Sequence, residues 1–497
     1  MSKTDKKSEK KSGEKKSAKK SGAKTPKFNT PICDNDMTFD DCELAILRHA
    51  VDETEEIQQK KIANNDEIVR ILATVEKFIA KRKLVCYGGT AINNILPKHA
   101  QFYNRDVEIP DYDFYSSNAM DDALDLANIY HKEGYAEVEA KAGIHAGTFK
   151  VYVNFIPIAD ITQLNKRIFK QISKDAIKVA GILYSPPNFL RMNMFLELSR
   201  PAGDVSRWEK VLKRMNLLNE YYPMEPRADC NNIDFQRKLD PDSTNGNDGD
   251  KLYLIVRDTF IDQDVIFFGG YASSLYSKYM GEHERKMIEK IPDFDVLSEE
   301  PEKCATIVKE KLQENGFKQV SIIHHEEIGE LIPEHYEIRV GKETVAFVYS
   351  PIACHSYNNL QIDGKTVHVA SIDTILTFYL AFTYIDEPYY NKDRLLCMAN
   401  FLFDVEQKNR LEQKGLLKRF SIDCYGKQLT MEEIRSQKAE RFKALSSKRG
   451  TREFDYYFLK YNPAAKKRTK SVTKLGPKSK DTKKKTQKSR TLFPGFF

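Results

Sequence analysis

The sequence predicts an α/β fold, of the α+β kind, in which two tandem units each pack a short mixed sheet on helices. One order of elements occurs twice: a short apolar strand, a glycine pair, a helix, and a strand that carries the pattern Asp-x-Asp. The spacing repeats too, because Asp111 follows Gly89 by 22 residues and Asp293 follows Gly270 by 23. A polar stretch at 240–251 lies between the copies and is typical of a linker. Together these observations indicate a duplicated domain.

The first unit follows two predicted helices, at 39–63 and 65–82, the second of which places its apolar residues on one face. Alternating apolar residues and Gly/Pro punctuation define the elements expected next. They are a strand at 84–89, a helix at 90–96, a strand at 111–116, a helix at 119–135, strands at 136–142 and 147–161, and mainly helix over 163–220. Short strands alternating with helices predict a small sheet covered by helices.

The second unit repeats these elements in the same order. VIFFGG (265–270) corresponds to LVCYGG, and DFDVL (293–297) corresponds to DYDFY. The helix EKCATIVKEKLQENGF (302–317) corresponds to the helix of the first unit that follows Asp-x-Asp. We also match TVAFVYSPIAC (344–354) with FKVYVNFIPIAD. The sequence therefore predicts a second domain of the same fold.

The ends of the chain differ in composition from its body. Residues 1–30 contain 11 lysines against three acids, and residues 464–497 contain 12 lysines or arginines against one acid. We expect both arms to be disordered, either as polyanion-binding arms or as solubilising, nuclear-localisation-like tails. The expected organisation is a basic tail (1–30), N-terminal helices (31–83), a first unit (84–225), a linker (226–250), a second unit (251–405), a C-terminal helical segment (406–462) and a basic tail (463–497).

Composition excludes several classes of protein. The 497 residues are 41% hydrophobic and 11% aromatic, so a sizeable core can form and wholesale disorder is excluded. No apolar run approaches the roughly 18 to 20 residues of a membrane helix, and the N-terminus lacks the apolar segment of a secretory signal. The eight cysteines show no zinc-type spacing. We expect them to be reduced residues of an intracellular protein.

Asp111 and Asp113 are the first candidates for chemistry. On a strand, side chains at i and i+2 leave the same face, so the two carboxylates converge while Tyr112 and Phe114 point into the core. Carboxylates held so close repel each other unless a cation lies between them, and such hard oxygen ligands suit Mg²⁺ or Mn²⁺. The alternative for an isolated pattern of this kind is an exposed strand edge with two solvated acids.

Three neighbouring features favour a site. Gly88, Gly89 and Thr90 lie between a buried strand and a helix, where backbone N–H groups and the helix dipole can face a phosphate and the threonine adds a hydroxyl. Asp160 offers a third carboxylate on a strand that can lie beside the first, as two divalent ions about 3.5–4 Å apart require. The order of strand, glycine pair, helix, acidic pair and third acid is the arrangement that such a site needs.

The second unit departs from this pattern in two places. Tyr271 stands where the first unit has Thr90, and Cys354 stands where it has Asp160. A soft thiol is a poor ligand for Mg²⁺. We therefore predict a degenerate, non-catalytic unit that has a structural role or lines a substrate path.

The pattern of strand, Gly-Gly-[Ser/Thr], helix, acidic pair and third acid resembles the polymerase-β-like nucleotidyltransferase superfamily. Longer stretches, among them YGGTAINNILPKHAQFYNRDVEIPDYDFYS and SPPNFLRMNMFLELSRPAGDVSRWEKVLKRMNLLN, resemble the poly(A) polymerase catalytic subunits of large cytoplasmic DNA viruses. The giant-virus (mimivirus-type) and asfarvirus proteins are most similar, and the poxvirus enzyme is more distant. The resemblance is strongest over 84–222, fair over the second unit and absent from the arms.

This resemblance implies a template-independent polynucleotide adenylyltransferase that adds AMP from ATP to RNA 3′ ends with two Mg²⁺ or Mn²⁺ ions. The glycine pair and Thr90 would hold the triphosphate. Asp111 and Asp113 would bind both metal ions, and Asp160 would bind the ion near the 3′-hydroxyl. Poxvirus relatives also carry a C-terminal domain of the same fold without activity, which agrees with a degenerate second unit.

Three basic residues join the candidate site. The resemblance makes Arg207 and Lys210 triphosphate or RNA contacts, whereas Lys150, on the strand leading to Asp160, either reaches a phosphate or is simply exposed. The expected partners are the RNA 3′ end, ATP and a second copy of the chain, with no membrane. The expected location is intracellular, in the host cytoplasm (the viral factory) and in the virion.

Two other functions stay open from the sequence. One is another enzyme on the same fold, such as a uridylyl or CCA-adding transferase or a nucleotide-second-messenger synthase. The other is a non-catalytic RNA-binding scaffold. The intact glycine pair, Thr90 and the three acids of the first unit argue against a scaffold.

Overall fold

The structure, a computed structural model, describes residues 28–63, 65–104, 109–226, 228–233, 235, 248–288 and 293–465. Most of both expected basic tails and of the expected linker therefore lies outside the described residues, and the domain boundaries stay predictions. The chain separates into two compact parts. The smaller part is Met1–Asn64 with Asp106–Glu108, and the larger part is the remainder of the chain. No helix in the described part of the chain is both long and apolar enough to cross a bilayer.

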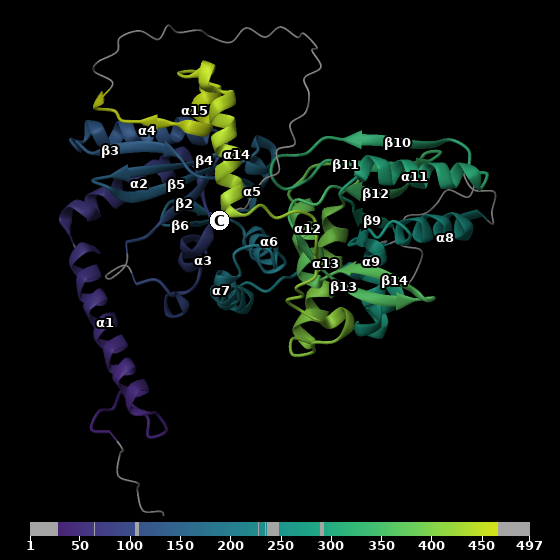
Figure 1. Cartoon of the computed structure of the whole chain (residues 1–497), viewed down its shortest axis with the longest axis horizontal. Coiled ribbons are helices and arrows are strands. Elements are labelled where there is room, and N and C mark those ends of the chain that lie inside the picture. Colours follow the sequence, from purple (N-terminus) through teal and green to yellow (C-terminus); the bar gives the residue numbers. More distant parts are fainter. Residues whose placement is uncertain are drawn as a thin grey trace, which may run out of the picture. The chain divides into compact units, whose positions relative to one another are not determined.

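Each compact part has one of the two expected N-terminal helices. The smaller part contains α1 (Phe39–Ala63), and the larger part begins with α2 (Asp66–Arg82) (Figure 1). The Asn65 side chain caps α2 by accepting a hydrogen bond of 2.8 Å from the Glu67 N–H. The helix ends at Lys83, which is left-handed. The apolar spacing correctly predicts which side chains of α2 are buried.

Eight strands form the first sheet, in the order β16-β3-β4-β5-β2-β1-β7-β6. They are β1 (Val85–Cys86), β2 (Tyr112–Ser116), β3 (Val138–Ala142), β4 (Thr148–Val153), β5 (Ile156–Gln163), β6 (Ile177–Val179), β7 (Ile182–Tyr184) and β16 (Lys460–Tyr461). β2 is parallel to β5 and β1 to β7, and the other pairs are antiparallel. α2 and α4 (Ala119–Lys132) contact each other, both contact β5, and together they cover one face (Figure 1).

Further helices surround this sheet. α3 (Gly88–Ile95), α6 (Pro187–Leu198) and α7 (Trp208–Tyr221) pack against one another, and α5 (Lys166–Asp175) follows β5. α3 ends before Pro97, as expected from the missing N–H group of proline. The strand at 111–116 and the helix at 119–135 are also found where the sequence predicts them, to within three residues.

The stretch 147–161 forms two strands, and the prediction of one strand is wrong. β4 ends at Val153 and β5 begins at Ile156, and the two residues between them are left-handed: Asn154 has a φ of 51° and Phe155 a φ of 65°. Such a pair forms a two-residue hairpin turn, which Asn-Gly or Asp-Gly normally indicates. Phe155 is 81% exposed and is not a residue type that indicates a turn, so the hairpin could not be predicted from the sequence.

The stretch 163–220 is also less helical than predicted. β6 and β7 form a hairpin between α5 and α6. Its turn consists of Ala180 and Gly181, both with positive φ. This hairpin matters because β7 lies beside β1 and thereby fixes the strand that leads into the glycine pair.

The second sheet has the same plan, in the order β10-β11-β12-β9-β8-β14-β13-β15. Its strands are β8 (Ile266–Phe267), β9 (Phe294–Leu297), β10 (Val320–His325), β11 (His335–Val340), β12 (Glu343–Tyr349), β13 (His355–Ile362), β14 (Lys365–Ala370) and β15 (Cys424–Tyr425). β9 is parallel to β12 and β8 to β14. α8 (Asp248–Ile261) and α11 (Pro301–Glu314) pack together on this sheet, as α2 and α4 do on the first (Figure 1). The predicted pair of mixed sheets on helices is confirmed.

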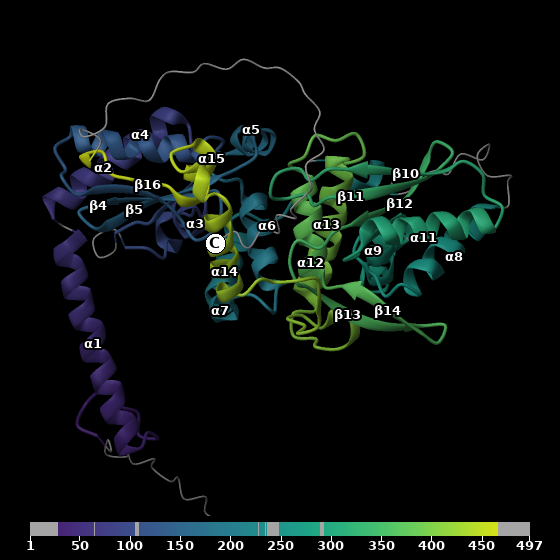
Figure 2. The same cartoon turned by 45° about the horizontal axis from the view of Figure 1, so that its top comes forward.

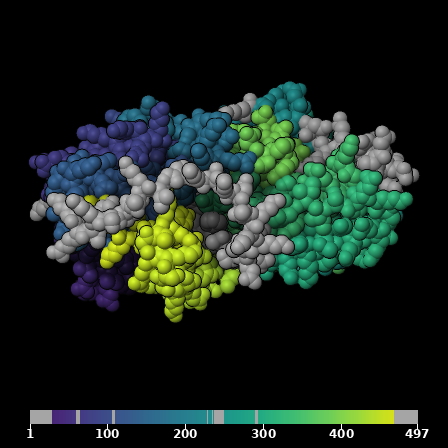
Figure 3. Space-filling model, turned by 90° about the horizontal axis from the view of Figure 1, so that it is seen from above, coloured from purple at the N-terminus to yellow at the C-terminus, as the bar shows by residue number. Residues whose placement is uncertain are grey.

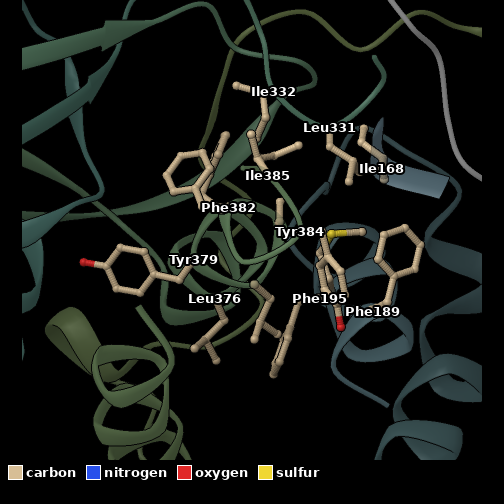
Figure 4. Close-up of a cluster of buried hydrophobic side chains, with 14 of the residues drawn as sticks. Ile168, Phe189, Phe195, Leu331, Ile332, Leu376, Tyr379, Phe382, Tyr384 and Ile385 are labelled. Atoms are coloured by element: carbon tan, nitrogen blue, oxygen red, sulfur yellow. The ribbon is translucent and has the colours of Figure 1, made fainter. Parts of the chain in front are cut away.

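Short and central helices complete the second half. α9 (Gly270–Tyr276) and α10 (Glu282–Ile288) follow the second glycine pair, and α13 (Lys392–Lys408) packs on α12 (Ile372–Phe382). α12 in turn packs on α6 of the first half, and every residue of α12 is buried. Figure 4 shows the shared core, in which Phe189 and Phe195 lie beside Tyr384 and Leu376. The rings of Phe189 and Tyr384 meet edge to face, with centroids 5.0 Å apart.

The C-terminal segment contributes to both sheets. β15 pairs with β13 at the edge of the second sheet, and β16 pairs with β3 at the edge of the first. Between them lie α14 (Met431–Ala444) and α15 (Arg452–Phe458). Figures 2 and 3 show these helices in yellow on the surface of the first half. The segment predicted as helical at 406–462 thus also supplies two edge strands.

Six of the eight cysteines are paired, so the expectation of reduced thiols is wrong for this structure. The disulfides join Cys33 to Cys42, Cys230 to Cys397 and Cys354 to Cys424, and Cys86 and Cys304 are free and buried. The longest link spans 167 residues of sequence. Its partners meet only in the folded chain, and no short spacing indicates their pairing.

Candidate active site

β2 directs its carboxylates to one side of the first sheet. Tyr112 and Phe114 are fully buried, and the Tyr112 hydroxyl donates a hydrogen bond to Glu76 of α2 on the helix-covered face. Because side chains alternate along a strand, Asp113 projects from the opposite face. Asp111 lies one residue before β2 and interacts electrostatically with Asp113.

Asp160 lies on the neighbouring strand. β5 runs parallel to β2 and places Asp160 directly opposite Asp113. On its other side, β4 runs antiparallel and places Lys150 opposite Asp160, where the two side chains form a salt bridge. Three adjacent strands therefore bring Asp113, Asp160 and Lys150 into one row across the sheet, which we call the carboxylate row together with Asp111.

The carboxylate row is short of positive charge. Burial, followed by the charges of Asp111 and Asp160, raises the pKa of Asp113 well above its usual range. Burial and the charge of Asp160 also raise the pKa of Asp111. Burial would lower the pKa of Lys150, but its hydrogen bond to Asp160 and the charge of that group outweigh burial and raise the pKa. The row is therefore an environment that an additional cation would stabilise.

The acids are near one another but are not yet gathered as metal ligands. Within the described residues, no three His, Cys, Asp or Glu side chains form a group that could hold an ion. The Asp160 carboxylate instead forms a salt bridge with the ammonium group of Lys150. A divalent cation would compete with this ammonium group for the carboxylate.

The glycine pair lies against the same strand. The Tyr87 N–H donates to the Asp113 carbonyl over 3.0 Å. Gly88 has a φ of 69°, and a Cβ built on it would stand 3.1 Å from the Asp113 carboxylate, so a side chain here would be strained. α3 begins at Gly88, and its N-cap residue Tyr87 makes no capping hydrogen bond through its side chain. The first N–H groups of α3 are therefore available to an anion.

Thr90 does not present its hydroxyl as a free donor. The side chain is buried, and the hydroxyl donates a hydrogen bond of 2.7 Å to the Asp111 carbonyl. This bond ties α3 to the start of β2. Thr90 thus positions the acidic pair, whereas the sequence suggests a direct phosphate contact.

Arg214, which is not among the residues predicted for the site, lies over the glycine pair. Its guanidinium donates to the Tyr103 hydroxyl, and a Cβ at Gly89 would stand only 2.8 Å from the guanidinium and 2.5 Å from that hydroxyl. Arg207, the N-cap residue of α7, and Lys210 and Arg214 within α7 recur at i, i+3 and i+7, which places them on one side of the helix. Helical periodicity was therefore the signal that could have identified Arg214.

Arg207 and Lys210 differ in their environment. Arg207 pairs with Glu197, a buried residue of α6, with 3.3 Å between Nε and Oε1. Its charge also lowers the pKa of Asp113, against the larger effects of burial and of the neighbouring acids. Lys210 is exposed on the first turn of α7. Arg207 is thus electrostatically coupled to the carboxylate row.

The second unit has lost its third acid, but not by the substitution predicted. β12 is parallel to β9 and places Phe347 opposite Asp295, as Asp160 stands opposite Asp113 in the first unit. Cys354 lies beyond the end of β12 and forms a disulfide. The match of Cys354 to Asp160 was wrong because it aligned the single strand β12 with the β4–β5 hairpin.

An internal cation occupies what remains of the second site. Arg394 of α13 donates to Asp293, with 3.1 Å between Nη2 and Oδ2. The surrounding cavity measures about 40 Å³ and is lined in part by Phe347, Tyr379 and Tyr389. About 10–15 Å³ of such space holds one water molecule, so this cavity has room for only a few waters. This geometry agrees with a non-catalytic second unit.

The glycine pair and the carboxylate row lie within a segment that is similar to known proteins. Residues 73–204 match the family described as poly(A) polymerase catalytic subunit. The chain is 35% identical over 174 residues to a predicted poly(A) polymerase catalytic subunit of African swine fever virus (strain Badajoz 1971 Vero-adapted). It is 33% identical over 202 residues to a predicted poly(A) polymerase catalytic subunit of Acanthamoeba polyphaga mimivirus. These alignments cover 34% and 39% of this chain and 36% and 32% of the viral proteins, about a third of each relative's length. The resemblance predicted from the sequence is confirmed over this segment.

The fold as a whole also has a solved counterpart. The crystal structure of the Megavirus polyadenylate synthase matches with a TM-score of 0.69, covering 81% of this chain and 83% of that one. Sequence identity over the match is 18%, so the likeness establishes a shared fold.

Proposed function

We propose that this chain is a poly(A) polymerase, a template-independent polynucleotide adenylyltransferase that transfers AMP from ATP to the 3′ end of RNA. The observation that carries the proposal is that the family match at 73–204 contains the glycine pair and the whole carboxylate row. In this reaction the terminal 3′-oxygen attacks the α-phosphorus of ATP, the bond to the β-phosphate breaks, and pyrophosphate leaves. The chemistry requires no covalent intermediate on the protein.

Asp111, Asp113 and Asp160 are the residues that would hold two divalent ions, Mg²⁺ or Mn²⁺. Carboxylates are the hard oxygen donors that these ions prefer. The raised pKa of Asp113 supports the assignment, because a half-buried carboxylate with like-charged neighbours lacks a compensating cation. When bound, the ions lower the pKa of the 3′-hydroxyl and neutralise charge on the triphosphate.

The glycine pair and α7 would bind and orient the triphosphate. The N–H groups at the start of α3 can face the phosphates because Gly88 carries no side chain that would intervene. Arg214 supplies a guanidinium beside Gly89, and guanidinium groups bind phosphate oxygens in a planar, two-pronged geometry. Arg207 and Lys210 extend the same basic face of α7.

The proton of the 3′-hydroxyl passes to the Asp160 carboxylate or to a water molecule. Lys150, which pairs with this carboxylate, holds its orientation across the strand pair. Thr90 fixes Asp111 through its backbone carbonyl. The proposed roles thus divide between groups that touch the substrate and groups that position them.

RNA and ATP are the proposed substrates, and the second unit contributes structure. The viral relatives support an intracellular location, which we propose to be the cytoplasmic viral factory and the virion. Formation of a homodimer stays a prediction, which sedimentation of the full chain would test.

The substrate assay incubates the full chain with each of the four nucleoside triphosphates and Mg²⁺ or Mn²⁺, with and without an RNA primer. We expect primer-dependent addition of AMP. A preference for UTP, or for CTP followed by ATP, would identify a uridylyl or CCA-adding transferase instead. Products formed without primer would indicate a second-messenger synthase, and no incorporation would leave a binding scaffold.

The site assay compares Asp113→Asn and Asp160→Asn with Asp295→Asn, the matched change in the second unit. We expect the first two to lose AMP addition by about a thousandfold or more, equivalent to about 4 kcal/mol of transition-state stabilisation. Asp295→Asn should retain activity because Phe347 has replaced the third acid of its unit. A nearly normal rate for Asp113→Asn would contradict the assignment.

A further inference from the structure

A groove separates the edge of the first sheet from the C-terminal helices; we call it the C-terminal groove. α14 is held over the β3–β4 turn, because the Lys438 ammonium group donates to the Gly143 carbonyl over 2.5 Å. α15 is followed directly by β16, which pairs with β3 (Figures 1 and 2). The space between these elements measures about 700 Å³. This volume lies in the range of ligand pockets, about 300–1,000 Å³.

The lining of the C-terminal groove is strongly cationic. Its charged members are Lys141 and Lys150 of the sheet and Arg435, Lys438 and Lys443 of α14, and no acidic side chain of the described residues lines it. Arg435 and Lys443 are exposed and form no salt bridge within the described part of the chain. Lys141 and Lys150 pair with Glu139 and Asp160, which lie outside the lining. The three cations of α14 repel one another, and a polyanion would relieve that repulsion. The chain's own tail at 464–497, with 12 basic residues and one acid, has the wrong charge to fill this groove.

Aromatic side chains lie among these cations. Phe442 lines the groove with 38% of its surface exposed, and it meets Phe458 edge to face with centroids 5.1 Å apart. Arg449 lies over the Phe442 ring at 5.1 Å, and Lys438 lies 5.9 Å from the Phe458 centroid. Arg435, Lys438 and Phe442 recur at i, i+3 and i+7, so one face of α14 presents both kinds of group. Aromatic platforms within a basic groove are the features that bind single-stranded nucleic acid.

The C-terminal groove leads to the carboxylate row. Lys150 lines the groove and also pairs with Asp160. Asp160 in turn stands opposite Asp113 on the adjacent strand. A strand of nucleic acid lying along α14 would therefore end one side chain away from the proposed catalytic acids.

We propose that the C-terminal groove binds the last nucleotides of a single-stranded RNA, with phosphates on Arg435 and Lys443 and a base stacked on Phe442. The RNA 3′ end would then pass Lys150 to reach the carboxylate row. The identity of the nucleic acid as an RNA substrate rests on the proposed function. The existence of a single-strand-binding groove rests only on its charge, its aromatic groups and its shape.

The test measures binding of a short, 5′-labelled oligoadenylate to the full chain by fluorescence anisotropy over a range of salt concentrations. The double variant Arg435→Gln, Lys443→Gln should bind about tenfold more weakly. Its slope of log affinity against log salt should fall by about 1.4, because each phosphate contact on a single strand accounts for about 0.7. Phe442→Leu keeps the apolar packing and removes the stacking face. It should weaken binding roughly tenfold with the salt slope unchanged.

The matched control is the double variant Lys303→Gln, Lys311→Gln on α11. It removes the same charge from exposed side chains that pair with acids elsewhere on the surface, and it should leave both affinity and slope unchanged. Equal RNA affinity and slope for the groove variant and the wild type would overturn the proposal. If the groove variant instead lost only binding of labelled poly(glutamate), the groove would take an acidic protein.

The same variants separate this proposal from the proposed function. The groove variant should raise the KM for the RNA primer in AMP addition and leave the KM for ATP unchanged. A wild-type chain that binds oligoadenylate through the groove but adds no nucleotide would refute the enzyme and retain the groove. A chain that adds AMP normally in the groove variant, with unchanged primer KM, would retain the enzyme and refute the groove.

Discussion

Replacing Arg214 with methionine tests whether the guanidinium beside Gly89 binds the triphosphate. The guanidinium stands 2.8 Å from the place of a Gly89 Cβ, and hence beside the first N–H groups of α3. Losing one hydrogen bond from a charged group costs about 1.5–3 kcal/mol. This cost corresponds to a change of about 10- to 150-fold in an equilibrium constant. Methionine keeps an unbranched apolar stem, so the packing of α7 should be retained.

We expect the KM for ATP to rise by that factor and kcat to change less, because Arg214 contacts the triphosphate before and during the reaction. The assay is primer extension over a range of ATP concentrations, accompanied by thermal unfolding of each variant. Arg214 also donates to the Tyr103 hydroxyl. Tyr103→Phe removes only that bond and should leave the KM for ATP nearly unchanged.

Lys213→Met is the matched control on the same helix. The Lys213 side chain is 73% exposed and pairs with Glu209 one turn away. It should not affect ATP binding. A wild-type KM in Arg214→Met, or an equal rise in Lys213→Met, would show that local charge at Gly89 does not hold the triphosphate.

Three further predictions concern stability and covalent state. Gly88→Ala should lower the free energy of unfolding by about 1–2 kcal/mol in urea titrations, because an L-residue is strained at a φ of 69°; an unchanged midpoint would mean that the turn relaxes. Burial, and after it the charge of Arg200, lower the pKa of His355 from 6.5 to about 3. Part of the free energy of unfolding that is present above pH 6.5 is therefore lost as the pH falls toward 3. His355→Leu should flatten this loss, and parallel curves of unfolding free energy against pH for variant and wild type would contradict it. Thiol titration of the denatured, unreduced chain should detect two free thiols, Cys86 and Cys304, and a count of eight would show that no disulfide forms.

Elements with a strong local signal could be predicted from the sequence. The apolar residues of α2 recur at helical spacing, Asn65 is a preferred N-cap residue, and the last turn carries the basic residues that helices favour there. In β2, Asp113 lies between the buried Tyr112 and Phe114, so the face on which it projects followed from period two alone. The duplication was visible because both glycine pairs retain their distance to Asp-x-Asp. Each of these signals is contained within a short window.

The remaining features depend on contacts between distant segments. The hairpin turn at Asn154 and Phe155 has left-handed backbone that the strand pairing enforces, and no glycine indicates it. Missing that turn shifted the alignment of the second unit and concealed Phe347 as the replacement for the third acid. Arg214 is significant only because α7 packs over the glycine pair. Pairing of Cys230 with residue 397 likewise requires the folded chain.

The two units should respond in opposite directions to the loss of one acid. In metal-free buffer, Asp113→Asn should raise the melting temperature, because the amide removes a negative charge that burial and two neighbouring acids disfavour. Asp293→Asn should instead lower the free energy of unfolding by about 1–3 kcal/mol, because it leaves the Arg394 guanidinium without its counter-charge. Differential scanning fluorimetry with a chelator, with and without added Mn²⁺, compares the two variants directly.

This contrast explains why one unit keeps a site and the other does not. In the second unit, Arg394 neutralises Asp293 and Phe347 removes the third charge, so the fold itself has satisfied the acids. In the first unit, Lys150 pairs directly with Asp160, but its charge and that of Arg207 do not outweigh burial and the like charges at Asp113, which a divalent ion would compensate. Added Mn²⁺ should therefore stabilise the wild-type chain and stabilise Asp113→Asn less. If Asp113→Asn and Asp293→Asn destabilised the chain equally, the first unit's acids would already be compensated within the protein, and the reason for placing metal ions there would disappear.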